Sequence, residues 1–167
     1  PGALRGMLCT VVILLAALLV AGTLVTAAGP HAGDADTPRL AVDLPTLAQL
    51  HGDLLVAFLG LLTGLGFALC VVGVPARTWW RYVVLIGVVL AQGTLGVVQY
   101  LTGVPEVLVS LHVLGAVTVV VAMAALWTAC RVRDGLTGYQ GQPSTAPASG
   151  AQPSTESTAI ATNTSAR

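Results

Sequence analysis

The fold is decided by Leu54–Val74, which reads LLVAFLGLLTGLGFALCVVGV and contains no charged residue. A helix crosses a hydrocarbon core of about 30 Å with roughly 20 apolar residues, so this run is long enough to span a membrane. Three further runs meet the same criterion: Met7–Val25, Tyr82–Leu101 and Val107–Cys130. Only 8% of the residues are charged, against roughly 25% in soluble domains. The sequence therefore predicts an integral membrane protein with four transmembrane helices.

The connections between these runs predict the order of the helices. The segments Pro75–Arg81 and Thr102–Glu106 are short, and short connections join antiparallel neighbours. The longer segment Thr26–Pro45 is rich in Gly, Pro and Asp, which is typical of irregular loops. Thr46 follows Pro45 and can begin a helix, so the second span is expected to cover residues 46–74. We expect an all-α, up-down-up-down bundle that forms one transmembrane domain of residues 1–133.

The C-terminal part of the chain differs in composition. From Gln140 to Arg167 it consists mainly of Ser, Thr, Pro, Ala, Gly and Gln, with almost no large apolar residue. Such a segment cannot bury enough apolar surface to offset the entropy lost on ordering. Residues 134–167 are therefore predicted to form a disordered tail.

The distribution of basic residues predicts the orientation in the membrane. One side carries five of them, Arg5, Arg77, Arg81, Arg131 and Arg133, whereas the other side carries Arg39 in a loop with several aspartates. Because basic short loops stay in the cytoplasm, both termini, and with them the tail, are predicted to be cytoplasmic. The formal net charge is zero, so nothing indicates a nucleic-acid partner, and the expected surroundings are a lipid bilayer.

Two histidines stand at the borders of predicted spans, where ionisable groups usually mark function. His51 precedes Leu54, at the outer end of the second span, and His112 follows Val107, near the outer end of the fourth. These two spans run in the same direction. At 1.5 Å rise per residue, both imidazoles are expected at similar depth, facing a common interior.

Such a pair suits heme better than zinc. Zinc takes four ligands, or three and a water, and no Cys or carboxylate near the outer surface completes that set. Heme iron needs only two axial ligands, for which imidazole is usual. Gly52, Gly115 and Ala116 are small enough to let a macrocycle approach the helices, and the outer loop offers His31 and Arg39 as candidate propionate partners. The alternative is that each histidine only hydrogen-bonds a neighbouring helix.

Several motifs resemble heme A synthases over about Leu4 to Arg133. GTLVT at 22–26, running into GPHAGD at 29–34, resembles the segment after that family's fifth span, and LAQLH at 47–51 resembles the start of its sixth. QGTLG at 92–96, YLTGVP at 100–105 and Leu111-His112 are similar to its seventh and eighth spans. The chain departs from members with a cysteine pair in an outer loop, because neither outer loop here contains cysteine.

The resemblance implies that this chain is the C-terminal half of an eight-span oxidoreductase of the bacterial cell membrane. That half carries one heme b, and His51 and His112 match its two axial ligands. The N-terminal half receives heme O, whose C8 methyl is oxidised to the formyl of heme A for cytochrome oxidase. The substrate-site residues belong to that other half, so no catalytic residue is expected in this segment. The implied partners are heme, the N-terminal half, heme O synthase and cytochrome oxidase.

Two other functions are compatible with the sequence. A free-standing b-type cytochrome would carry electrons without a substrate of its own. An oxidase assembly factor without heme would leave both histidines as packing residues. A cytochrome that passes electrons across the membrane favours a heme near each face, whereas the inner halves of these spans contain no histidine.

Overall fold

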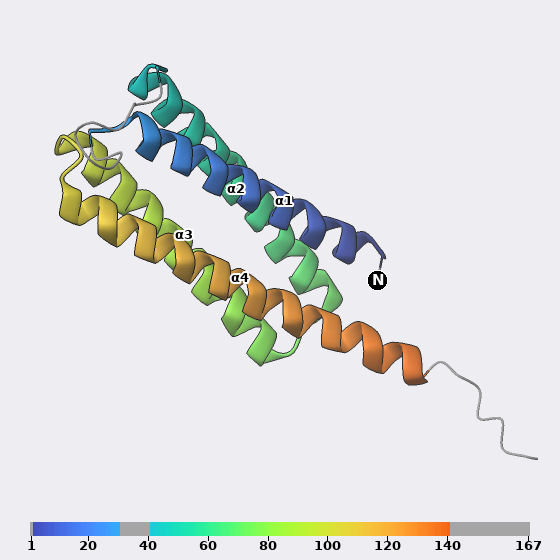
Figure 1. The fold of residues 1–167 in the computed structure, drawn as a ribbon. Coiled ribbons are helices and arrows are strands. Elements are labelled where there is room, and N and C mark those ends of the chain that lie inside the picture. Colours follow the sequence, from blue (N-terminus) through green and yellow to red (C-terminus); the bar gives the residue numbers. More distant parts are fainter. Residues whose placement is uncertain (1, 31–40, 141–167) are drawn as a thin grey trace, which may run out of the picture.

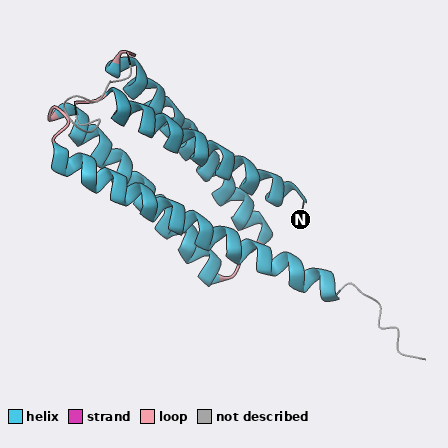
Figure 2. Cartoon of the chain, in the orientation of Figure 1, coloured by secondary structure: helices cyan, strands magenta, loops and turns pink. Residues whose placement is uncertain are grey.

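A computed structural model describes residues 2–30 and 41–140, and this part of the chain contains helices and no strand. The helices are α1 (Gly2–Ala28), α2 (Leu44–Val72), α3 (Ala76–Leu101) and α4 (Glu106–Gln140). Each is long and apolar enough to cross a membrane. The all-α four-helix membrane fold predicted from the sequence is thus confirmed (Figures 1 and 2).

Helix α2 has well-defined ends. The Asp43 carboxylate accepts hydrogen bonds from the Thr46 backbone N–H (3.2 Å) and hydroxyl (2.9 Å), which is a side-chain N-cap. Pro45 occupies the first turn, where its missing N–H costs nothing. At the other end, Gly73 adopts φ 65°, the left-handed conformation that favours glycine at a C-cap. These local signals start α2 at Leu44, close to the predicted Thr46.

Helices α3 and α4 extend beyond their predicted spans. Helix α3 begins at Ala76 rather than Tyr82, because the Pro75 carbonyl already accepts hydrogen bonds from the N–H groups of Thr78 and Trp79 (2.9 and 3.1 Å). Helix α4 continues to Gln140, past residue 133, where the predicted domain ends. Hydropathy marks where the chain leaves the hydrocarbon, whereas backbone hydrogen bonds determine where a helix ends. The rest of the predicted tail, residues 141–167, lies outside the described residues.

The helices pair as two antiparallel hairpins, α1 with α2 and α3 with α4 (Figure 1). Helix α2 also contacts α3, and α1 contacts α4, which closes the bundle. We call the end at which α1 and α3 finish and α2 and α4 begin the histidine end, because it carries His51 and His112. The opposite end, where α1 and α3 begin, is called the terminal end.

The interior of the terminal end is filled by apolar side chains from all four helices. The fully buried residues there are Val11, Leu62, Leu65, Leu69, Leu85 and Leu126. Two hydrogen bonds tie α3 to its neighbours: the Tyr82 hydroxyl donates to the Leu62 carbonyl (3.1 Å), and the Arg81 guanidinium donates to the Ala125 carbonyl (2.9 Å). The terminal end is therefore the close-packed part of the bundle.

The outward faces of the helices are apolar as well. Ile13, Val56, Phe67 and Leu114 are each between 65% and 71% exposed. In a soluble protein such a surface would be an aggregation liability, whereas in a membrane it contacts lipid tails. The chain is accordingly a multi-pass membrane protein.

Candidate functional site

The structure brings His51 and His112 together at the histidine end. His51 comes from the second turn of α2 and His112 from the second turn of α4. Their ring centroids are 6.4 Å apart and the ring planes are inclined by 69°. The prediction that these histidines share one depth and one interior is thus met by the geometry.

Each histidine lies against a glycine of the partner helix in its own hairpin. A Cβ added to Gly22 of α1 would lie 3.0 Å from Cε1 of His51. A Cβ added to Gly96 of α3 would lie 3.2 Å from Cε1 of His112. Contacts this short require a neighbouring atom to shift by a few tenths of an ångström, so glycine lets each imidazole lie close to the partner helix. The two hairpins thus share one arrangement, in which the imidazole of one helix packs against a glycine of the other.

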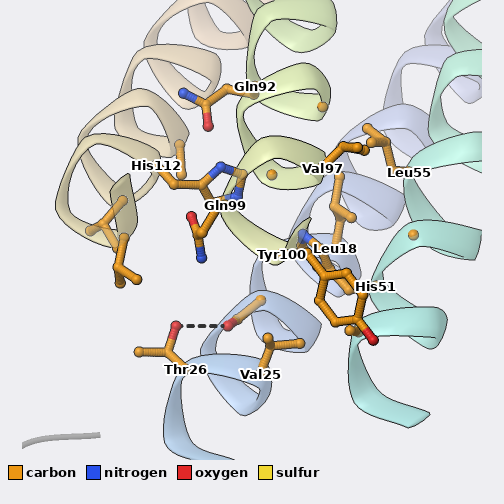
Figure 3. Close-up of a pocket in the computed structure, with 18 of the residues that line it drawn as sticks. Leu18, Val25, Thr26, His51, Leu55, Gln92, Val97, Gln99, Tyr100 and His112 are labelled. Atoms are coloured by element: carbon orange, nitrogen blue, oxygen red, sulfur yellow. Dashed lines mark hydrogen bonds between the residues drawn. The ribbon is translucent and has the colours of Figure 1, made fainter. Parts of the chain in front are cut away.

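A cavity of about 500 Å³ surrounds the two rings and receives residues from all four helices (Figure 3). Its walls are mainly aliphatic, including Leu18, Val25, Leu55 and Val97, and Tyr100 also lines it. The hydroxyl of the lining residue Thr26 donates to the Gly22 carbonyl (3.1 Å), which satisfies that hydroxyl within α1. The cavity stops at a floor formed by residues that also belong to the packed core, Phe58, Val89 and Val119.

Four polar atoms at this end are buried and have no hydrogen-bond partner among the described residues. They are Nδ1 of His51, Nδ1 of His112, and the Oε1 atoms of Gln92 and Gln99. A buried polar atom left unsatisfied costs about 1–3 kcal/mol. A ligand or a proton donor that pairs with these atoms would therefore stabilise the histidine end.

The spacing of the rings suits a metal ion held between them. Metal–imidazole bonds are about 2.0–2.1 Å long. In a five-membered ring with bonds of about 1.33 Å, each atom lies about 1.1 Å from the ring centre. Two such bonds in line would separate the ring centres by roughly 6.3 Å, which matches the observed 6.4 Å. Among the described residues, no group of three or more His, Cys, Asp or Glu side chains could hold a metal, so a zinc-like site is not formed there.

The small residues near His112 differ from the prediction in one respect. Gly52 and Ala116 do line the cavity. Gly115 does not provide room for a macrocycle, because a Cβ at this position would overlap the Gln92 amide. The expectation for Gly115 is therefore wrong: this glycine makes space for a side chain of α3.

Sequence reasoning also missed Gln92 and Gln99 as cavity residues. Both line the cavity, and they are seven residues apart on α3, which places them on one helix face. The available signal was their polarity, because an amide inside a span is costly and usually faces the bundle interior.

The remaining candidates lie elsewhere. The proposed propionate partners, His31 and Arg39, lie outside the described residues. Asp53 is exposed on α2, where its carboxylate accepts a hydrogen bond from the Gln49 amide (2.8 Å). Glu106 is exposed in the first turn of α4, where a negative charge suits the helix N-terminus. Neither carboxylate lines the cavity.

Comparison of the chain with protein-family models, with curated proteins and with solved structures finds no match.

Proposed function

We propose that this chain binds one heme b at its histidine end, with His51 and His112 as the axial ligands of the iron. The observation that carries the proposal is the pair of imidazoles, 6.4 Å apart, inside a cavity of about 500 Å³. That volume lies within the range of about 300–1,000 Å³ that is usual for cofactor sites.

The residues of the cavity suit a porphyrin in size and polarity. Aliphatic walls contact the flat, apolar macrocycle and exclude water, and Gly22 and Gly96 let each imidazole lie close to the partner helix. The cavity is lined by residues at the helix ends of the histidine end, such as Pro30 and Pro45, where the propionates would reach polar surroundings. A bound heme supplies a one-electron redox centre, whose potential the axial ligands and their hydrogen bonds would set.

We further propose that the chain acts as the C-terminal half of a heme A synthase. The support is that residues of the resembling motifs converge on one site: Gly22, His51, Gly96 and His112 all line the cavity. The whole enzyme would oxidise the C8 methyl of heme O to a formyl group for cytochrome oxidase. This segment would then bind heme b beside a catalytic N-terminal half, because no carboxylate among the described residues lines its cavity.

A second candidate function is a free-standing b-type cytochrome. It is favoured by the fact that one chain provides both proposed ligands and lines the cavity with residues from all four helices. The two candidates differ in what happens when heme O and a reductant are supplied. A heme A synthase half converts heme O only when the N-terminal half is added, whereas a cytochrome converts none in either case.

The orientation proposed for this protein follows from its charges. Arg5 at the start of α1, Arg77 and Arg81 at the start of α3, and Arg131 near the end of α4 all lie at the terminal end. We place that end in the cytoplasm of a bacterial cell, because basic residues are retained there. A reporter fused after Arg133 should register as cytoplasmic, and a periplasmic signal would reverse the orientation.

The test of heme binding is a reduced-minus-oxidised spectrum of the purified chain and its histidine variants. Wild-type protein should show a low-spin b-type heme, and His51→Ala and His112→Ala should each remove that signal. His31→Ala is the matched control, because it removes a histidine of the predicted outer loop and should retain the low-spin spectrum. A six-coordinate low-spin spectrum in both span variants would show that the assignment is wrong.

A further inference from the structure

The two imidazoles lie against different helices. His51 lies against Gly22 of α1. His112 lies against Gly96 of α3. The spacing of residues along α3 shows which polar side chains lie next to Gly96. Residues three and four positions from Gly96 are its neighbours on the helix surface, and these positions hold Gln92 and Gln99. The ring of His112 is therefore bracketed by two amides.

Of these two amides, Gln92 packs against α4. Its amide group occupies the space above Gly115, where a Cβ would overlap it. Gly115 lies one turn after His112 on α4, so Gln92 and His112 are neighbours across the α3–α4 contact. In Figure 3 the Gln92 amide points toward the His112 ring with its oxygen.

The hydrogen-bonding needs of the two side chains are complementary. Oε1 of Gln92 is a buried acceptor without a donor, and Nδ1 of His112 is a buried nitrogen without a partner. An imidazole that binds a metal through one nitrogen almost always donates its other N–H to an acceptor. The amide oxygen of Gln92 can accept that bond.

We propose that Gln92 is the positioning residue for the ligand His112, accepting a hydrogen bond from the ring nitrogen that does not bind iron. This inference rests on the proposed heme site. Gly115 provides the space that the Gln92 amide occupies.

The expected consequence is a change in the redox equilibrium of the iron. An acceptor on the imidazole N–H makes the ligand more basic and so favours the oxidised iron. Gln92→Leu removes the acceptor at similar volume, so it should shift the equilibrium toward reduced iron by about tenfold, or about 59 mV for one electron. Loss of such a partner typically weakens metal binding by about 10–100-fold, so heme should also dissociate faster.

The experiment measures the midpoint potential and the heme dissociation rate in the full chain carrying heme. Gln92→Leu should raise both. Gly115→Ala, which displaces the amide, should change both in the same direction. Gln92→Glu keeps an acceptor oxygen at the same chain length and should hold the potential at or below the wild-type value. Gln99→Leu is the comparison variant, because it removes the other cavity amide of α3, and its shift in potential should be smaller than that of Gln92→Leu.

The outcomes separate this inference from the proposed function. If wild-type protein carries no low-spin heme, the proposed function fails. If it carries one and Gln92→Leu leaves its potential unchanged, or Gln99→Leu causes the larger shift, the role of Gln92 is refuted while the heme site stands. An upward shift in Gln92→Glu equal to that in Gln92→Leu would also refute it, because lost packing would then explain both.

Discussion

At the terminal end, Leu62, Leu65 and Leu85 have no exposed surface, whereas at the histidine end the same four helices enclose a cavity of about 500 Å³. The terminal end is closed by leucines, and its main polar side chains, Arg81 and Tyr82, both find backbone partners. The histidine end keeps glycines at its helix contacts and leaves four polar atoms unsatisfied. The close-packed core and the cavity thus lie at opposite ends of one bundle. Changes at the two ends should therefore have separable effects on stability and on the proposed heme binding.

The largest expected effect comes from filling the histidine end. Gly96→Val places a branched side chain where even a Cβ would lie 3.2 Å from the His112 ring. The imidazole must move, so we expect low-spin heme to be lost almost completely, and Gly22→Val should act in the same way on His51. The measurement is heme content per protein after purification.

Gly60→Val is the control for these two variants, because nothing lies within 4 Å of a Cβ at Gly60. It also introduces valine into a helix and should retain heme. Equal heme loss in Gly60→Val would mean that helix propensity, rather than the contacts between the histidines and Gly22 and Gly96, explains the result.

A moderate effect is expected from opening the terminal end. Leu65 is fully buried, and Leu65→Ala should lower the free energy of unfolding by an amount at the lower end of about 2–5 kcal/mol, because lipid tails already solvate leucine in the unfolded state. Titration with a denaturing detergent would measure this change. The heme spectrum should keep its shape. A large spectral change with unaltered stability would contradict the division between the two ends.

The smallest effect should come from a single hydrogen bond at the terminal end. Tyr82→Phe removes the bond from the hydroxyl to the Leu62 carbonyl (3.1 Å). Hydrogen bonds between transmembrane helices average about 0.6 kcal/mol, so the detergent titration should shift by about that amount and the spectrum should be unchanged. Loss of heme in this variant would show that the two ends are more strongly coupled than the packing indicates.

The sequence predicted the fold and the histidine pair because both depend on simple periodic properties. Apolar run length marks the spans, and parallel spans place His51 and His112 at one depth without any knowledge of packing. The contacts of the two histidines with Gly22 and Gly96 depend on how each helix is rotated about its axis, which hydropathy does not determine. The same lack of rotational information led to the wrong expectation for Gly115, whose space is taken by Gln92.

The helix boundaries show a second limit. Tyr82 was expected to begin the third span because Arg77 and Arg81 end the apolar run. The helix nevertheless begins at Ala76, because residues just outside the hydrocarbon can still form helical backbone hydrogen bonds. Pro75, at the N-cap of α3, has no N–H and so cannot donate a further helical hydrogen bond.

The central claim is that the histidine end holds one heme between two imidazoles and that the terminal end holds none. The most direct test is the heme-to-protein ratio of the purified chain, combined with its low-temperature electron paramagnetic resonance spectrum. We predict one heme per chain with the low-spin signal of two imidazole ligands. Two hemes per chain, or one heme with a high-spin signal, would contradict this account.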